Sequence, residues 1–309
     1  MKLVVVSEFL GDGFLDLLRD RLTVEYDPAL YADRARLLAV VIDAEGIIIR
    51  NRTRIDRELI AAAPQLKVVG RLGVGLDNID LDACEQAGIL VKPAIGANAV
   101  SVAEYVIGAM LVLLRPIYGM TASMLAGQWP RQGHAFGSEI MGKTMGLLGF
   151  GSIARLVATR ATTLGMRVVA YDPFVPVEDR VWVGVEQSAF RELFATADVV
   201  SVHVPLTEQT RNLVDAHAIA LMKPTAILIN TSRGGTVDES ALTDALRKGA
   251  IAGAALDVFA AEPLRPEAAA SFTGLGNVVL TPHVAGNTSE SVDRVARVTV
   301  ETVMEVLGG

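Results

Sequence analysis

Three side chains that could do acid–base or anion-binding chemistry stand shortly after apolar runs in the last third of the chain. They are Arg233, Glu262 and His283. Apolar runs that alternate with helical patterns predict parallel strands, and ligands bind where the carboxyl ends of such strands meet, at one edge of the sheet. We therefore expect a guanidinium, a carboxylate and an imidazole at the same edge.

Each of the three residues has an ordinary explanation when it is taken alone. A loop arginine is usually solvated, a Glu-Pro pair usually marks a turn, and a histidine is more often packed or exposed than catalytic. Together they meet the needs of hydride transfer to a 2-keto acid, whose carbonyl oxygen gains negative charge and must receive a proton. His283 can donate that proton, Glu262 can hold the imidazole in place, and Arg233 can grip a carboxylate with its fork of donors.

A glycine turn earlier in the chain predicts a partner for the hydride. The residues from Lys143 to Asp172 are typical of strand, turn, helix and strand. Gly149 permits the tight turn, Gly151 lets the backbone approach a pyrophosphate, and the helix start attracts its charge. Asp172 would accept hydrogen bonds from ribose hydroxyls and would repel a 2′-phosphate. An ordinary tight turn is the alternative, but the flanking strands, the helix and the acid favour a dinucleotide site for NAD rather than NADP.

The same alternation of apolar runs and helical patterns extends over the whole chain. It predicts an α/β fold of two doubly wound parallel-sheet domains, flavodoxin-like and Rossmann, with a cleft between them. The buried helix after Asn98 and the last helix, 289–306, are candidates to cross between the domains. Residues 1–98 plus 287–309 are then the expected substrate-binding domain, which is discontinuous, and residues 99–286 are the expected NAD-binding domain.

The apolar runs also give bounds for the expected elements. Strands are expected at 3–6, 23–26, 46–49, 66–70 and 89–91, and then at 145–150, 166–171, 199–204, 226–230, 252–256 and 278–280. In the first domain, helices are expected at 13–21, 33–43, 56–63 and 81–87.

Composition excludes several classes of protein. The 309 residues are 51% hydrophobic and 20% charged, which is typical of a compact globular protein, and the net charge of −7 argues against a nucleic-acid partner. The longest apolar helical stretch, Val100 to Leu114, is too short to span a bilayer, so we expect a buried core helix and no membrane partner. The single cysteine, Cys84, is expected to pack in a helix. It excludes a disulfide within the chain and a cysteine-cluster metal site, which suits a reducing, cytoplasmic location.

Several stretches resemble the D-2-hydroxyacid dehydrogenase family, in particular its phosphoglycerate dehydrogenase-like branch, over essentially the whole chain. They are GRLGVGLDNID at 70–80, the glycine motif, VHVPLT at 202–207, NTSRGG at 230–235, LDVF at 256–259 with Glu262-Pro263, and TPH at 281–283.

This resemblance implies a role for individual residues, and no metal. Arg233 would bind the substrate's carboxylate and carbonyl, His283 would be the acid/base, and Glu262 would pair with His283. The backbone at Val74 and Gly75 would hold the substrate carboxylate from the other domain. The implied cofactor residues are Ser152 and Ile153 at the pyrophosphate, Asp172 at the ribose, Val204, Thr231 and Asp257 along the nicotinamide half, and also Gly149, Gly151, Pro205 and Gly286.

Two arginines near the N-terminus bear on the substrate, which is expected to be a small anionic D-2-hydroxy acid. Arg50 and Arg52 follow a predicted strand and would suit a second anionic group, such as phosphate or sulfonate. Within the family, this run resembles enzymes that act on sulfolactate or 3-phosphoglycerate. If the substrate is of the hydroxypyruvate or glycerate type instead, both arginines are plain surface residues.

The resemblance also leaves alternatives in assembly and function. In such proteins Trp129 and Arg131 lie on a dimer-forming arm, so a homodimer is expected. His134 is expected at the surface, and the alternative is that it reaches a neighbouring active site. The C-terminal-binding corepressors share the fold and the three residues, and they bind NAD(H) and recruit partners, so an NAD(H)-sensing binding protein without significant turnover is the main alternative. Formate dehydrogenase also resembles this family, but it has a glutamine where Glu262 stands here.

Overall fold

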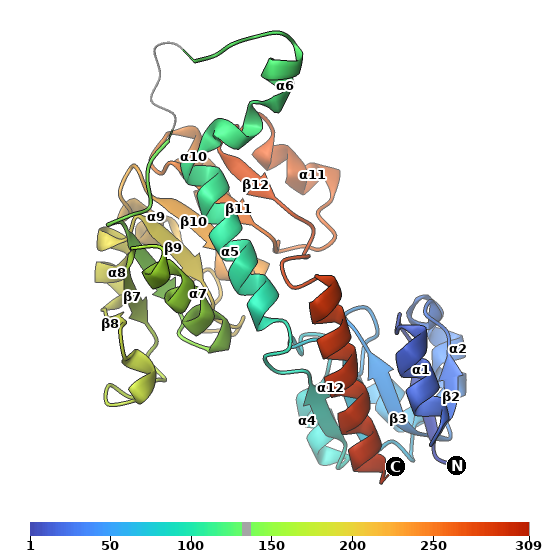
Figure 1. Ribbon diagram of the computed structural model, residues 1–309. Coiled ribbons are helices and arrows are strands. Elements are labelled where there is room, and N and C mark those ends of the chain that lie inside the picture. Colours follow the sequence, from blue (N-terminus) through green and yellow to red (C-terminus); the bar gives the residue numbers. More distant parts are fainter. Residues whose placement is uncertain (132–136, 309) are drawn as a thin grey trace. The chain divides into compact units, whose positions relative to one another are not determined.

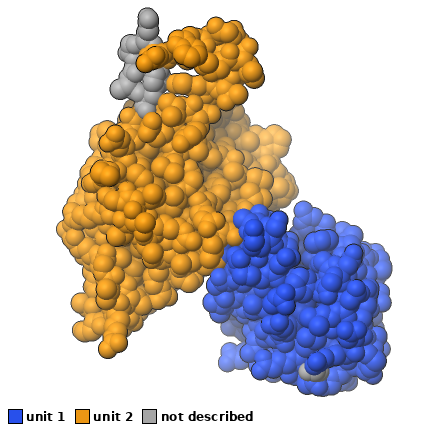
Figure 2. Space-filling model, viewed as in Figure 1, with its two compact units in different colours: residues 1–98, 287–309 blue, residues 99–286 orange. Residues whose placement is uncertain are grey.

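The structure is a computed structural model that describes residues 1–131 and 137–308. It divides into two compact units (Figure 2). Unit 1 comprises Met1–Asn98 and Asn287–Gly309, and unit 2 comprises Ala99–Gly286. Each unit has its own parallel sheet (Figure 1). His134 lies outside the described residues.

The described part of unit 1 contains a five-stranded parallel sheet with the order β2-β1-β3-β4-β5. The strands are β1 (Leu3–Val6), β2 (Thr23–Tyr26), β3 (Ala44–Ile49), β4 (Val68–Arg71) and β5 (Leu90–Pro93). This is the flavodoxin-like order, in which the connections leave β1 and β3 in opposite directions. The switch point between these two neighbouring strands is the expected place for a ligand.

The helices of unit 1 cover both faces of this sheet. They are α1 (Asp12–Arg19), α2 (Arg34–Val40), α3 (Arg57–Ala62), α4 (Leu81–Gln86) and α12 (Ser289–Leu307), with the short 3-10 helix η1 (Leu30–Ala32). Side chains alternate along β1, so that Val4 and Val6 pack towards α1 and α12 while Val5 packs towards α2, α3 and α4. Cys84 is buried in the second of these layers, as predicted.

The described part of unit 2 contains a seven-stranded parallel sheet with the order β12-β11-β10-β9-β6-β7-β8. The strands are β6 (Thr144–Leu148), β7 (Arg167–Tyr171), β8 (Glu186–Gln187), β9 (Val199–Val202), β10 (Ile227–Asn230), β11 (Gly253–Leu256) and β12 (Val278–Leu280). Counted from β6, this is the Rossmann order, and its switch point lies between β6 and β9.

The helices of unit 2 form a layer on each face of this sheet. They are α5 (Ala99–Leu114), α6 (Thr121–Leu125), α7 (Ser152–Thr163), α8 (Phe190–Thr196), α9 (Ala216–Ala220), α10 (Glu239–Arg247) and α11 (Pro266–Ala269), with 3-10 helices η2 (Pro116–Gly119), η3 (Arg180–Trp182), η4 (Gly234–Thr236) and η5 (Ala270–Phe272). α5 and α7 lie side by side on one face (Figure 1), and α8, α9 and α10 cover the other. α6 lies on an arm that extends beyond the sheet of unit 2 (Figure 1).

The two doubly wound parallel sheets confirm the predicted fold class, and α5 is the buried helix that was expected. Within the described residues, no helix combines the length and the apolar composition needed to cross a membrane. The predicted strands at 145–150 and 199–204 are wrong at their ends, because the chain leaves the sheet after Leu148 and Val202. The two-residue strand β8 was not predicted, since Glu186 and Gln187 are polar and exposed.

Candidate active site

The glycine turn lies at the switch point of unit 2, between β6 and α7. Gly149 has a φ of +92°, and a Cβ there would lie 2.8 Å from the carbonyl oxygen of His203, so both the conformation and the close approach require glycine. Gly151 is the N-cap of α7, and no side chain caps this helix start. A Cβ on Gly151 would meet nothing within 4 Å. The turn therefore offers open space and uncapped helix amides, which fit the pyrophosphate of a dinucleotide.

Asp172 follows β7 and is held beside the same turn. Its Oδ2 accepts a hydrogen bond from the amide of Phe150 at 2.8 Å, and its Oδ1 accepts one from the amide of Phe174 at 3.0 Å. Ser152, which is exposed, and Ile153, which is half-buried, begin the helix that follows this turn. The structure thus collects the residues expected at the pyrophosphate and at the ribose on one edge of the sheet.

The ends of β9 and β10 carry the next residues along this edge. Val204 and Pro205 follow β9, and Thr231 follows β10. Thr231 Oγ1 is buried and has no hydrogen-bond partner among the described residues. Leaving such a group unsatisfied costs about 1–3 kcal/mol, so a ligand that bonds to it is favoured. Thr231 therefore fits the predicted place of the cofactor. Gly286, which was also predicted there, is the last residue of unit 2.

His283 and Glu262 form a hydrogen-bonded pair at the carboxyl ends of β12 and β11. His283 Nδ1 lies 2.7 Å from Glu262 Oε2, and both side chains are partly exposed. Glu262 Oε1 also accepts the amide of Phe259 at 3.0 Å. Burial alone would raise the pKa of Glu262, but the hydrogen bonds from His283 and Phe259 and the charge of Arg233 lower it overall. The carboxylate is thus kept ionised beside the imidazole.

Asp257, at the end of β11, holds the loop that carries His283. It is only 1% exposed. Its Oδ1 accepts the Thr281 hydroxyl at 2.6 Å and the Val284 amide at 2.8 Å, and its Oδ2 accepts the Ala285 amide at 2.8 Å. The sequence predicted Asp257 only as a cofactor contact. Its role in fixing this loop was missed, because a carboxylate's partners cannot be read from its position in the chain.

His283 itself is in a strained backbone conformation. Its φ is +56°, in the left-handed region that residues other than glycine rarely adopt. The surrounding structure holds it there, since the His283 amide donates to the carbonyl oxygen of Asp257 at 2.7 Å. Such a conformation costs about 1–3 kcal/mol and tends to occur at functional sites.

A tyrosine extends this network to α5. The hydroxyls of Tyr105 and Thr281 lie 2.7 Å apart. Because Thr281 donates its one proton to Asp257, Tyr105 must be the donor to Thr281. Burial raises the pKa of Tyr105, which keeps the phenol protonated for this role. No sequence pattern pointed to Tyr105, since it lies 176 residues from its partner.

Arg233 lies directly against the loop that leads to Glu262. A Cβ on the next residue, Gly234, would lie 1.8 Å from the carbonyl carbon of Phe259, so only glycine allows these two segments to touch. Asn230 Nδ2 bonds to the Arg233 carbonyl oxygen at 2.9 Å and fixes the turn. The structure therefore brings Arg233, Glu262 and His283 to one edge of the sheet.

One more carboxylate near this site was not foreseen. Glu239 begins α10 and accepts a hydrogen bond from the amide of Ala260, in the loop before Glu262. Burial raises the pKa of Glu239, and the neighbouring charges of Asp238 and Glu262 raise it further, although the Ala260 amide opposes this. A glutamate in the first turn of a helix is common, so its sequence position alone gave no signal.

The remaining predicted site residues lie in unit 1. Arg50 and Arg52 share the loop after β3, and Val74 and Gly75 lie in the loop after the neighbouring strand, β4. Arg50 Nη2 donates to Asn287 Oδ1 at 2.9 Å. Arg52 lies over the ring of Tyr31 and donates to its hydroxyl.

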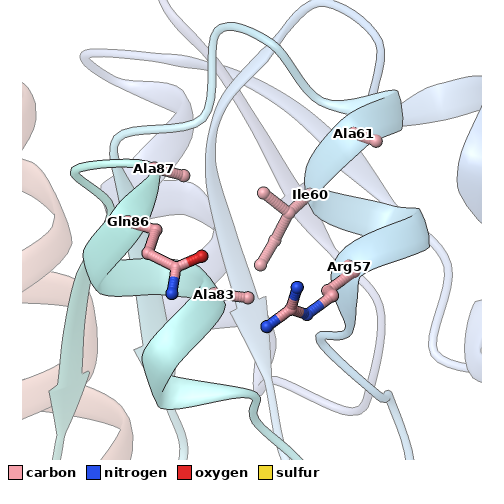
Figure 3. A pocket seen from close by; sticks show the side chains of 6 residues that line it. All are labelled: Arg57, Ile60, Ala61, Ala83, Gln86 and Ala87. Carbon is pink, nitrogen blue, oxygen red and sulfur yellow. The ribbon is translucent and has the colours of Figure 1, made fainter.

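Unit 1 also has a shallow groove between α3 and α4 (Figure 3). Its lining residues are Arg57, Ile60, Ala61, Ala83, Gln86 and Ala87. None of the predicted site residues lines this groove. Within the described residues, no group of three side chains is placed to hold a metal ion.

The family described as D-isomer specific 2-hydroxyacid dehydrogenase, NAD binding domain, matches residues 107–285. This range contains the glycine turn and the Arg233, Glu262 and His283 cluster. The chain belongs to this family. It is an NAD-dependent oxidoreductase of the 2-hydroxyacid dehydrogenase family, and the family resemblance predicted from its motifs is confirmed.

Full-length comparisons agree with this family assignment. The chain is 51% identical over 307 residues to the (S)-sulfolactate dehydrogenase of Chromohalobacter salexigens, covering 99% of this chain and 98% of that protein. It is 40% identical over all 309 residues to the D-3-phosphoglycerate dehydrogenase of Mycobacterium leprae, but spans only 57% of that protein's length. The crystal structure of the TT0316 protein from Thermus thermophilus superimposes with a TM-score of 0.89 at 37% identity, covering 99% of this dehydrogenase and 97% of TT0316. Nothing in these comparisons supports an NAD(H)-sensing binding protein without turnover.

Proposed function

We propose that this dehydrogenase reversibly oxidises a small 2-hydroxy acid that carries a second anionic group, of the sulfolactate or 3-phosphoglycerate type. The observation that carries this proposal is the pair Arg50 and Arg52, which share one loop at the carboxyl edge of the unit 1 sheet. Their guanidinium groups contact only neutral partners, Asn287 and Tyr31, among the described residues. Because no acidic partner in the described part of the chain compensates their positive charge, such arginines can bind an anion.

In unit 2, His283 would move the proton. Its Nδ1 is engaged by Glu262, so Nε2 is the ring atom that would take the proton of the substrate hydroxyl during oxidation and return it during reduction. The ionised Glu262 would stabilise the imidazolium that forms. Bound NAD would accept the hydride that leaves the substrate carbon bearing that hydroxyl.

Arg233 would bind the 2-carboxylate and the carbonyl oxygen of the substrate. A guanidinium offers several donors in a fixed plane, so it can hold both groups and stabilise the negative charge on the oxygen during reduction. In unit 1, the backbone at Val74 and Gly75 would offer amide donors to a substrate carboxylate. Val74 is partly exposed, which suits a contact with a ligand.

Asp172 would set the preference for NAD. Both of its oxygens are already held by backbone amides beside the glycine turn, so the charge is fixed where the ribose hydroxyls are expected. A 2′-phosphate at that place would meet a carboxylate and be repelled.

The arm that includes α6 supports a homodimer. Leu125 is 85% exposed and Trp129 is 70% exposed on this segment. Neighbouring large apolar side chains in water are unfavourable for a monomer and are typical of a protein interface. A homodimer formed through this arm is therefore part of the proposal. A cytoplasmic location is a separate part of it.

Steady-state NADH oxidation by the purified protein tests the substrate class. The panel is sulfopyruvate with pyruvate, and phosphohydroxypyruvate with hydroxypyruvate, because the members of each pair differ mainly in the second anion. We expect kcat/KM to be at least about a hundredfold higher for one doubly charged acid than for its partner. Equal or better use of hydroxypyruvate would instead make Arg50 and Arg52 surface residues.

A further inference from the structure

The loop that carries the two arginines lies at the switch point of the unit 1 sheet. Glu8 follows β1, and the loop from Arg50 to Thr53 follows β3, the neighbouring strand on the other side of the switch point. In sheets of this order, the crevice at the carboxyl ends of these two strands is where ligands bind. Topology alone therefore places Glu8 and the arginine loop where unit 1 is expected to meet a ligand.

Glu8 fixes the backbone of this loop. It is only 4% exposed. Its Oε1 accepts the amides of Arg50 at 2.8 Å, Thr53 at 3.0 Å and Arg52 at 3.2 Å. A buried carboxylate is costly unless it is hydrogen-bonded, and here the loop amides supply the bonds. The loop cannot change shape without breaking them.

The opposite side of the loop is held as well. Asn78 Nδ2 donates to the carbonyl oxygens of Thr53 at 2.6 Å and Arg50 at 3.2 Å. The hydroxyls of Ser7 and Thr53 lie 2.8 Å apart. The backbone that presents the two guanidinium groups is thus fixed through both its amides and its carbonyls.

Tyr31, in η1, fixes the guanidinium of Arg52. The Arg52 Cζ atom lies 4.9 Å from the centre of the Tyr31 ring, and the guanidinium also donates to the Tyr31 hydroxyl. The two contacts restrain the plane and the direction of this flexible side chain. Neither contact neutralises its charge.

Two other arginines of unit 1, Arg34 and Arg36, behave differently. Arg34 pairs with Asp56 and Glu58, and Arg36 pairs with Asp27. Their charges are compensated within the unit. The guanidinium groups of Arg50 and Arg52 are instead held by neutral groups, Asn287 and Tyr31, so the loop combines a fixed backbone with positive charge that these contacts do not compensate.

We propose that Glu8 and Tyr31 are positioning residues that hold Arg50 and Arg52 ready for the second anionic group of the substrate, a sulfonate or a phosphate. This inference rests on the proposed function. Glu8 acts on the loop backbone and Tyr31 on one guanidinium, so that the anion meets donors that lose little freedom when it binds.

The test compares four variants of the full-length protein with the wild type on the two substrate pairs named above. For Glu8→Ala and Tyr31→Leu, we expect KM for the doubly charged acid to rise about tenfold, with kcat and the values for its singly charged partner within about twofold. Glu8→Gln should resemble the wild type, because the amide oxygen can still accept the loop amides. Arg36→Gln, which removes one paired charge from the same unit, should leave kcat and KM unchanged for both acids.

The outcomes separate this inference from the proposed function. If wild-type protein shows no preference for a doubly charged acid, the proposed substrate class fails and the inference fails with it. If the preference exists but Glu8→Ala and Tyr31→Leu affect both acids equally, or lower KM for the doubly charged one, only the positioning role is overturned. If Glu8→Ala does not fold, the result for Tyr31→Leu decides the case. An additional variant, Tyr31→Phe, is then its matched control, because it keeps the aromatic ring. Sulfopyruvate and phosphohydroxypyruvate show which of the two anions is preferred.

Discussion

The carboxyl edges of the two sheets use the same local device for different chemistry. In unit 2, the buried carboxylate of Asp257 accepts the amides of the loop that carries His283. In unit 1, the buried carboxylate of Glu8 accepts the amides of the loop that carries Arg50 and Arg52. In both places an acid inside the protein shapes a backbone segment at the carboxyl edge of a sheet, at the switch point in unit 1 and beside the last two strands, β11 and β12, in unit 2.

The two edges differ in what the shaped loop presents. His283 Nδ1 is hydrogen-bonded to a second carboxylate, Glu262, whose ionised form would stabilise a protonated imidazole. Arg50 and Arg52 meet only neutral groups among the described residues, so their charge is available to an anion. The two edges therefore differ in the partner of the presented side chain, a carboxylate for His283 and neutral groups for the two arginines, although a buried acid holds both loops.

Removal of the proton-transfer group should have the largest effect. His283→Ala should lower kcat by about 10²-fold or more, because no other described side chain at this edge is placed to replace the imidazole. The dissociation constant of NADH, measured by fluorescence titration, should change by less than about twofold. A kcat within a few-fold of wild type would show that the two edges do not differ in the way described here.

Breaking the loop anchor behind His283 should come next. Asp257→Asn replaces one acceptor oxygen by an NH2 group, which cannot accept both sets of loop amides, so His283 should lose its position. We expect kcat to fall about thirtyfold. The melting temperature and NADH affinity should be measured in parallel, since a fall in kcat that only follows unfolding would not support a positioning role.

Removal of the carboxylate charge beside His283 should have the next largest effect. Glu262→Gln should lower kcat for reduction at neutral pH about tenfold and move the pH optimum of reduction to lower pH, because the protonated imidazole loses its stabilising carboxylate. The pKa of Glu262 is lowered, so in the wild type this carboxylate stays ionised, and its support for the imidazolium is lost only as pH falls below the ordinary carboxyl range. An unchanged pH profile would remove Glu262 from this role.

The smallest effect is expected at the far end of the network. Tyr105→Phe removes the donor to Thr281 but leaves the packing of α5 intact. We expect kcat to fall about threefold with KM for NADH unchanged. Thr281→Val, which also breaks the bond to Asp257, is the matched variant and should lower kcat more than Tyr105→Phe does.

The sequence predicted the fold class because its signal is periodic and local. Buried parallel strands appear as short apolar runs, and the order of those runs determines which side chains follow strand ends. That logic placed Arg233, Glu262 and His283 at one edge, where the structure brings them together. Their roles in catalysis remain predictions.

What the sequence could not supply was the identity of the partners that hold these groups. Glu8 lies 42 residues from Arg50, and Tyr31 lies 21 residues from Arg52. The local sequence around Glu8 or Tyr31 carries no signal for these contacts, which form only when the folded sheet brings the loops together. The helices from α8 to α11, which span four to nine residues each, were also not predicted individually.

The absence of a Cβ at Gly234 restricts which substitutions the neighbouring segments can accept. The peptide of Phe259 and Ala260 occupies the space that a Cβ would need. The segment that carries Arg233 and the segment that leads to Glu262 are therefore in direct backbone contact, and we expect a change in the backbone of one to displace the other. A library that varies residues around Arg233 should keep Gly234 fixed, and selection for a larger substrate should recover compensating changes in both segments at once.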